Sequence, residues 1–296
     1  MPCFQRLMVG LTRTGGDAAI IRYAGMLRRC GAVGEVRFVH VLPGGALASA
    51  SQSLTDLQAA VKAHFSAAPQ GGQPFCDVLE GPLTDVLLSQ AAEHKVDLIL
   101  VGTNRDSTGR RTLIRRLAMK APCSVWIVPE DAGDSVRRIL VPIDFSDHAA
   151  DTLRVAVSLA PFCGQVECLA LHVYFNEAVI TYEEYDQVLR GQEEEAYRKF
   201  VAPIDCGSVP VRPLFEEGPN VARVIGRVAE REAADLIVMG TRGRSRSAAI
   251  LLGSVTEEAI RETRVPLLAV KHFGAHLTVL QALLDPRLRH SGVHTD

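Results

Sequence analysis

The sequence lacks several features that would point to particular classes of protein. No run approaches the eighteen or so apolar residues that a membrane-spanning helix needs, and the first residues do not have the pattern of a secretory leader. Lys plus Arg (32) and Asp plus Glu (34) nearly balance, with a net charge of −2. This balance argues against a surface built for nucleic acid or for an anionic membrane. We therefore expect a cytoplasmic protein that binds neither nucleic acid nor membrane.

Cysteine is present, but without the spacing of a metal site. None of the seven cysteines belongs to a C-x-x-C pair, and the closest two, Cys163 and Cys168, have no His or Cys partner at zinc-ligand spacing. Most of the cysteines lie in apolar surroundings, which is typical of buried thiols. The sequence thus predicts neither a metal site nor a disulfide.

A duplicated pattern organises the chain. RLMVGLT (6–12) corresponds to RILVPID (138–144), and DLILVGT (97–103) corresponds to DLIVMGT (235–241), so matching segments lie between 130 and 140 residues apart. This period is too long for a solenoid repeat and indicates two copies of one domain. We place the copies at residues 1–131 and 136–273, and we expect residues 274–296 to form a C-terminal helical tail.

Each copy alternates short Val-, Ile- and Leu-rich runs with amphipathic stretches. Five such runs per copy predict a parallel sheet built from βαβ units, with helices on both faces. The predicted fold class is therefore α/β, with two tandem, doubly wound, five-stranded Rossmann-like domains that bind ligands at the carboxyl ends of their strands. Leu54–Phe65 and Thr181–Phe200 have helical spacing, and we interpret the acidic run Glu193–Glu195 as a solvated face. The linker 129–136 is short and polar, so we expect the two domains to pack together.

A glycine-spaced loop precedes a helix in the second copy. Gly240, Gly243 and Gly253 have the spacing G-x2-G-x9-G, and Ser254 follows directly. Glycines allow backbone N–H groups to approach an anion, and a helix N-terminus adds unpaired donors and a positive dipole end. Three arginines of the loop add positive charge: Arg242, Arg244 and Arg246. The loop predicts a cradle for polyphosphate, and the alternative is a capping box in which Ser254 is the N-cap and Glu257 its partner.

These residues, together with ILVPIDFSDHA, the LHV strand and the closing VPLLAV, resemble the universal stress protein family up to about Lys271. In the nucleotide-binding branch of that family, G-x2-G-x9-G-[ST] holds ATP. The resemblance implies three groups of site residues: Pro142, Asp144 and Val173 for adenosine; Met239, Gly240, Arg242 and Gly243 for ribose and phosphate; and Gly253, Ser254, Val255 and Thr256 around the phosphates. We expect Mg²⁺ to accompany the triphosphate. Alternatively, Asp144 only assists the start of the next helix beside Ser146.

The first copy departs from this pattern. Thr12 stands where the second copy has Asp144, Arg105 replaces the second glycine, and the loop is six residues shorter. A shorter loop with a bulky arginine cannot easily surround phosphates, so we expect no nucleotide in the first copy. Its basic cluster is interpreted as a solvated face, with anion binding as the alternative; it comprises Arg105, Arg110, Arg111, Arg115 and Arg116.

Candidate catalytic groups are few. His40 and His172 occupy matching positions, but no nucleophile motif or metal-ligand spacing accompanies them, so we interpret both as satisfied strand-end histidines and predict no catalytic residue. The sequence favours a stress-response regulatory protein that binds ATP in its second domain and hydrolyses it slowly at most. Two alternatives are an adenine-nucleotide hydrolase or transferase and a nucleotide-independent assembly module.

The resemblance also has implications for assembly. It implies that the two copies pair through their fifth strands, Ser124–Val128 and Leu267–Lys271, as a pseudo-dimer within one chain. It leaves open a homodimer of full chains and a protein partner of unknown identity.

Overall fold

The computed structural model describes residues 3–12, 16–65, 72–103, 108–175, 183–241 and 252–271. Its first half contains, in chain order, β1 (Phe4–Leu11), α1 (Asp17–Arg29), β2 (Val33–Leu42), η1 (Leu47–Ser49), α2 (Ala50–His64), β3 (Phe75–Glu80), α3 (Leu83–Glu93), β4 (Leu98–Thr103), α4 (Thr108–Lys120) and β5 (Ser124–Pro129). Its second half contains β6 (Arg138–Ile143), α5 (Asp147–Cys163), β7 (Glu167–Tyr174), α6 (Glu183–Val201), β8 (Val211–Glu217), α7 (Val221–Arg231), β9 (Leu236–Gly240), α8 (Ser254–Glu262) and β10 (Leu267–Val270).

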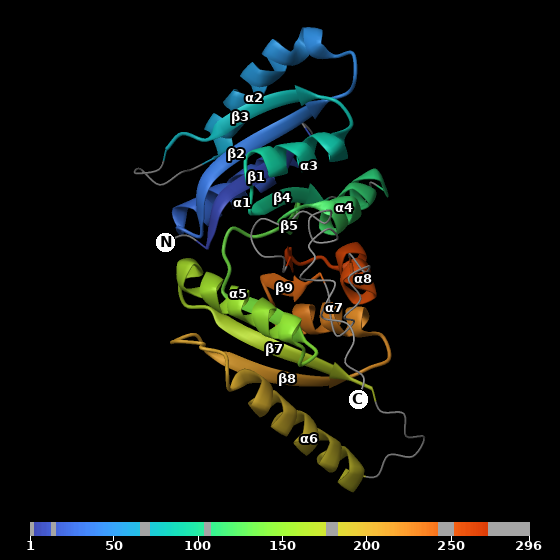
Figure 1. The fold of residues 1–296 in the computed structure, drawn as a ribbon. Helices are drawn as coiled ribbons and strands as arrows, with labels where there is room; N and C mark the ends of the chain where they lie inside the picture. The colour runs from blue at the N-terminus through green and yellow to red at the C-terminus, as the bar shows by residue number, and fades with distance from the viewer. Residues whose placement is uncertain are drawn as a thin grey trace, which may run out of the picture.

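The ten described strands form one sheet in the order β3-β2-β1-β4-β5-β10-β9-β6-β7-β8. Within each half neighbouring strands are parallel and the third strand of that half lies at the outer edge, which is the order of a doubly wound fold. This confirms the predicted fold class. Figure 1 shows the sheet extending from the strands beside α2 to those beside α6.

The two halves join where β5 pairs with β10. This pairing is antiparallel, with Leu268 opposite Trp126, so the predicted contact between the fifth strands is confirmed. The Lys271 N–H also donates to Ser124 Oγ at 3.2 Å. The short linker and this strand pairing together hold the two halves against each other.

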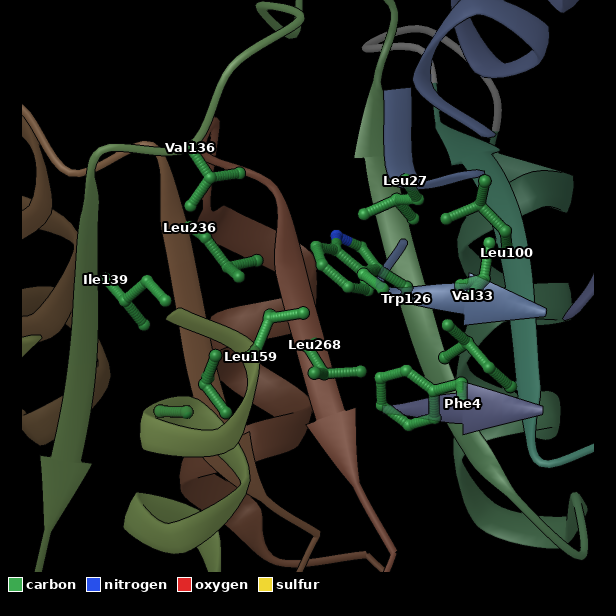
Figure 2. Packing of buried hydrophobic residues seen from close by; sticks show 14 of the residues in the cluster. Phe4, Leu27, Val33, Leu100, Trp126, Val136, Ile139, Leu159, Leu236 and Leu268 are labelled. Carbon is green, nitrogen blue, oxygen red and sulfur yellow. The ribbon is translucent and has the colours of Figure 1, made fainter. Parts of the chain in front are cut away.

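Side chains alternate between two helical layers along the joining strands. Trp126 and Leu268 point to the layer that contains α1 and α5, whereas Ile127 and Leu267 point to the layer that contains α3, α4, α7 and α8. Figure 2 shows Trp126 and Leu268 side by side in a core that both halves share. Because Trp126 is completely buried, this junction is part of the hydrophobic core rather than a surface contact.

The two helical stretches that the sequence predicts correspond to α2 and α6, and their bounds differ from the predicted ones by a few residues. The expected tail, 274–296, lies outside the described residues. Within the part of the chain that the structure describes, every helix is too short or too polar to cross a bilayer.

Candidate functional site

A cavity of about 840 Å³ opens at the carboxyl ends of the second-half strands. It is lined by nine of the residues that the family resemblance implies: Pro142, Asp144, Val173, Met239, Gly240, Gly253, Ser254, Val255 and Thr256. The other two, Arg242 and Gly243, lie outside the described residues. Segments that are more than a hundred residues apart in the sequence therefore meet around one space, whose volume is typical of a small-molecule pocket.

The cavity begins where β6 and β9 stop pairing. Their ladder ends at the pair Leu140 and Ile237. The Arg138 carbonyl accepts from the Asp235 N–H at 2.9 Å, and because backbone groups alternate sides along a strand, those of residues 140 and 142 also point toward β9. Residue 142 is proline and has no N–H to donate. The ladder therefore cannot continue through Pro142, and the two strands separate.

The helix α8 begins at the rim of this cavity. Gly253 is its N-cap, with φ −70° and ψ 147°, so the cap residue has no side chain that could accept a hydrogen bond. The capping-box alternative is therefore wrong, because Ser254 is already the first helical residue and Glu257 makes its backbone bond to the Gly253 carbonyl. A helix offers no internal partner to the N–H groups of its first turn. Ser254, Val255 and Thr256 thus bring three such donors to the cavity wall.

The fold alone does not explain why residue 253 is a glycine. A Cβ at this position would lie 3.6 Å from the Thr241 carbonyl oxygen and 4.0 Å from Thr256 Oγ1, which are ordinary contacts, and its φ suits any residue. The Thr256 hydroxyl is itself engaged, because it donates to the Gly240 carbonyl at 2.8 Å. The Thr256 hydroxyl therefore links α8 to the end of β9. Only the Thr256 N–H remains for the phosphate contact that the family resemblance implies.

Asp144 follows β6 and has a defined orientation. Its Oδ1 accepts from the Ser146 N–H at 3.1 Å and from Ser146 Oγ at 2.5 Å. Ser146 in turn caps α5, because its Oγ accepts from the Ala149 N–H at 3.2 Å. Asp144 therefore does assist the start of the helix, as the alternative proposed, and it lines the cavity at the same time.

The cavity lining also includes His172, a strand-end histidine that the family resemblance does not assign to the site. His172 Nδ1 lies 2.9 Å from the Ile143 carbonyl oxygen, its Nε2 lies 3.2 Å from Glu193 Oε2, and its ring stacks on Phe145 with centroids 4.2 Å apart. The matching His40 Nδ1 lies 3.1 Å from the Leu11 carbonyl oxygen. The prediction of satisfied strand-end histidines is confirmed for both rings.

Glu193 corrects the interpretation of the acidic run on α6. Its side chain is 23% exposed and meets His172, whereas Glu194 and Glu195 are exposed. Glu193 shares a helical face with the buried Tyr197 one turn later, and this i, i+4 relation is the sequence signal that would have separated it from its neighbours. The rim also includes the aromatic side chain of Phe175, which is 60% exposed.

A contact between the halves reaches the phosphate side of the cavity. Arg115 Nε on α4 lies 2.5 Å from Glu257 Oε1 on α8, and Glu257 lines the cavity. Arg111, Arg115 and Arg116 are all exposed, which agrees with a solvated basic face. Arg105 and the side chain of Arg110 are not among the described parts of the chain.

The corresponding place in the first half is nearly closed, with a volume of about 20 Å³. The Asp17 carboxylate fills part of it, because Oδ1 accepts from the Thr12 N–H at 3.1 Å and from Thr12 Oγ1 at 3.2 Å. The Glu130 carboxylate lies directly over Gly16 at the same place. Leu113 of α4 also lines this space. Small volume and two carboxylates make this place unsuitable for a phosphate.

Comparisons with known proteins agree with the duplication. A model of the universal stress protein family matches residues 4–129 and again residues 135–271. A universal stress protein of Thermus aquaticus is 31% identical over 138 residues, which are 46% of this chain and 98% of that protein. One from Methanocaldococcus jannaschii is 29% identical over 141 residues, which are 46% of this chain and 82% of the relative.

A solved structure covers both halves. The crystal structure of a universal stress protein from Archaeoglobus fulgidus matches 91% of this chain and 97% of its own, with a TM-score of 0.62 and 19% identity. At that identity the likeness concerns the tandem fold alone.

Proposed function

Because this chain belongs to the universal stress protein family through both of its halves, we propose that it is a regulatory protein of the stress response that binds ATP in its second half only. The observation that carries the proposal is the 840 Å³ cavity at the ends of β6 and β9, where nine residues of the expected site lie together. The nearly closed counterpart in the first half supports the restriction to one site.

The cavity offers suitable chemistry for each part of the nucleotide. Val173 and Pro142 are apolar walls for the adenine, and the oriented Asp144 carboxylate can accept from an amine or a hydroxyl group. The first-turn N–H groups of α8 and the positive end of its dipole suit a phosphate. We expect Met239 and Gly240 on the ribose side, and Arg242 and Gly243 to complete the cradle.

Mg²⁺ would be held mainly by the phosphate oxygens and by water. Within the described residues, His, Cys, Asp and Glu form no cluster that holds a metal ion by itself. We propose that the metal binds together with the triphosphate, whose oxygens supply most of its ligands.

Calorimetric titration of the full chain with ATP and Mg²⁺ tests the proposal. We expect one site per chain. Asp144→Ala should weaken binding at least about tenfold, because a hydrogen bond to a charged group contributes about 1.5–3 kcal/mol. Thr12→Ala is the matched control, since it changes the corresponding position of the first half, and it should leave the affinity unchanged.

Two results would contradict the proposal. Two equivalent sites per chain would show that the first half binds nucleotide despite its closed strand ends. Absence of binding by protein freshly stripped of nucleotide would favour the assembly module instead. Mass spectrometry of gently purified protein adds an independent check, since adenine nucleotide should co-purify.

We propose that hydrolysis is slow or absent. In the cavity both ring nitrogens of His172 already face oxygen atoms, one on Ile143 and one on Glu193, so this ring is not placed to activate water. The hydrolase or transferase alternative requires turnover of about 1 s⁻¹ or more, the low end of ordinary enzyme rates. Timed release of phosphate with and without Mg²⁺ distinguishes the two functions.

A further inference from the structure

Cysteines from both halves meet where the C-terminal end of α1 packs against the C-terminal end of α5. Cys3 Sγ lies 3.4 Å from Ser158 Oγ of α5. One residue after Cys30, a Cβ on Gly31 would lie 3.5 Å from the ring of Phe162, the residue before Cys163. The packing of these neighbours brings Cys30 and Cys163 together, and their side chains are within hydrogen-bond reach of each other.

The two thiols differ in acidity. The S–H of Cys163, and after it the backbone N–H of Ala32 and the charge of Arg29, lowers the pKa of Cys30 below its ordinary value, although burial acts in the opposite direction. The same hydrogen bond and burial raise the pKa of Cys163. In its protonated form Cys30 donates instead to the Leu27 carbonyl at 3.3 Å. The charge of Arg29 and the N–H of Ala32 lie on the Cys30 side of the pair and favour its thiolate, which is the nucleophilic form.

Both side chains are also accessible. Cys30 and Cys163 are partly exposed and carry free thiols, whereas Cys123 and Cys168 are buried. A small oxidant can thus reach the pair from solvent.

We propose that Cys30 and Cys163 form a thiol pair that hydrogen peroxide oxidises to a disulfide between the two halves of the chain. The Cys30 thiolate attacks the peroxide, takes one oxygen as a sulfenic acid and releases hydroxide. The Cys163 sulfur then attacks the Cys30 sulfur, so that the S–S bond forms and the S–O bond breaks, and the oxygen leaves as water with the Cys163 proton. In total the two thiols lose two electrons and two protons, and one peroxide becomes two waters.

The position of the pair gives the bridge a specific consequence. Cys30 precedes β2 and Cys163 precedes β7, so both lie at the amino ends of the strands, opposite the cavity at the carboxyl ends. Figure 1 shows that α1 and α5 lie on the same side of the sheet, one in each half. The disulfide would therefore lock the two halves together without touching the nucleotide site, and it does not depend on ATP binding.

Peptide mapping of the full chain tests the pair directly. Reduced protein is freed of reductant, treated with a small molar excess of hydrogen peroxide, digested with trypsin without reduction and analysed by tandem mass spectrometry. We expect peptides containing Cys30 and Cys163 joined with the loss of two hydrogens, and the loss of two of the seven free thiols. Dithiothreitol should reverse both. The thermal midpoint of the oxidised protein should rise by about 5 °C or more, because the bridge closes a long loop.

Variants separate this pair from general oxidation. Cys30→Ser and Cys163→Ser should each abolish both the joined peptides and the thermal shift, while Cys76→Ser, at a partly exposed cysteine away from the cluster, should retain them. A bridge between Cys3 and Cys163, a sulfinic acid on Cys30 without a bridge, or a disulfide between chains would overturn the assignment. Mapping of the wild-type protein decides the question even where a variant folds poorly.

Discussion

The ends of β6 and β9 enclose a cavity of about 840 Å³, whereas the corresponding ends of β1 and β4 enclose about 20 Å³. The two halves share one topology, so the difference comes from a few local residues. In the first half Gly10 stands where the second half has Pro142, and the ladder of β1 with β4 continues to the pair Gly10 and Val101. A proline that cannot donate is therefore associated with the open crevice, and a glycine with the closed one.

The connections after the fourth strands differ as well. Residues 104–107 join β4 to α4, whereas residues 241–253 join β9 to α8. The short connection starts α4 early, and its Leu113 lines the space in which a ligand would lie. A fold of this kind therefore does not by itself provide a site, because strand separation and loop length decide whether one exists.

The largest effect is expected at the junction, where the first half supports the second. Trp126→Ala should lower the free energy of unfolding by about 3–5 kcal/mol, because it removes a fully buried side chain from the shared core. Urea unfolding followed by far-ultraviolet circular dichroism measures this, with both halves unfolding in one shifted transition. Phe175→Ala, at a residue that is 60% exposed, should change stability by no more than about 0.5 kcal/mol. Two transitions, one of them unshifted, would show that the halves are independent.

The next largest effect is expected on ATP affinity, at the backbone N–H donors of the first turn of α8 in the second half. Ser254→Pro removes the N–H of the first residue of α8, a position where proline is well tolerated, and the extended Gly253 before it suits a following proline. ATP affinity should fall about tenfold or more relative to Ser254→Ala, which removes the hydroxyl but keeps the N–H. Titration calorimetry measures both variants. Equal affinities would mean that this N–H does not contact the phosphate.

The sequence predicts the features of the two halves that follow from local patterns, and it fails for those that depend on tertiary packing. Hydrophobic periodicity and the repeat predict the sheets and their doubly wound order, because local patterns determine strands and helices, whereas the β5–β10 contact is implied only by the family resemblance. The residues that line the cavity are implied by the family resemblance, carried over position by position. The N-cap of α8, by contrast, is Gly253 and not Ser254, because the backbone is extended at Gly253 and helical from Ser254 onward.

Contacts between the side chains of segments far apart in the sequence are not predicted from the sequence. Glu193 meets His172 across the cavity, and Cys30 lies beside Cys163 although their spacing matches no disulfide or metal motif. Both pairs arise from the packing of helices on the sheet. Residue spacing can show which side of a helix is buried, as for Glu193 and Tyr197, but it does not show which distant residue that side meets. Arg115, assigned to a solvated face, likewise finds Glu257 in the other half.

The contact between Arg115 and Glu257 predicts a smaller effect, in which the first half influences the ATP site proposed for the second half. Arg115→Ala leaves the Glu257 carboxylate without its partner at the cavity wall, so ATP affinity should fall about two- to fivefold, in line with an exposed ion pair. The loss should shrink as the salt concentration rises. Arg116→Ala, at the neighbouring exposed position, is the control. An equal loss in both variants would indicate a general effect of positive charge instead of this contact.

The smallest effect is expected at an ion cluster at the end of α7, where the halves differ again. Glu232 follows α7 and contacts Arg212 Nη2 at 2.9 Å and Arg231 Nε at 3.0 Å, whereas the corresponding residue after α3 is His94. Arg212, and after it Arg231, lowers the pKa of Glu232 in the folded protein. Because the pKa of Glu232 is lower in the folded protein, its ionised carboxylate stabilises the fold at pH values above the unfolded pKa of about 4.3. This stabilisation is lost as the pH falls through the folded pKa.

Glu232→Gln should therefore lower the free energy of unfolding by less than about 1 kcal/mol at pH 7, since both arginine partners of Glu232 are exposed and such ion pairs contribute little. Its difference from the wild type should close as the pH is lowered from 5 toward 3. Urea unfolding at both ends of that range measures the change. Glu93→Gln, at the end of α3, is the matched control, because its carboxylate accepts from the neutral Gln90. A difference between Glu232→Gln and the wild type that persists at low pH would assign the effect to packing, because a protonated Glu232 has lost its charge.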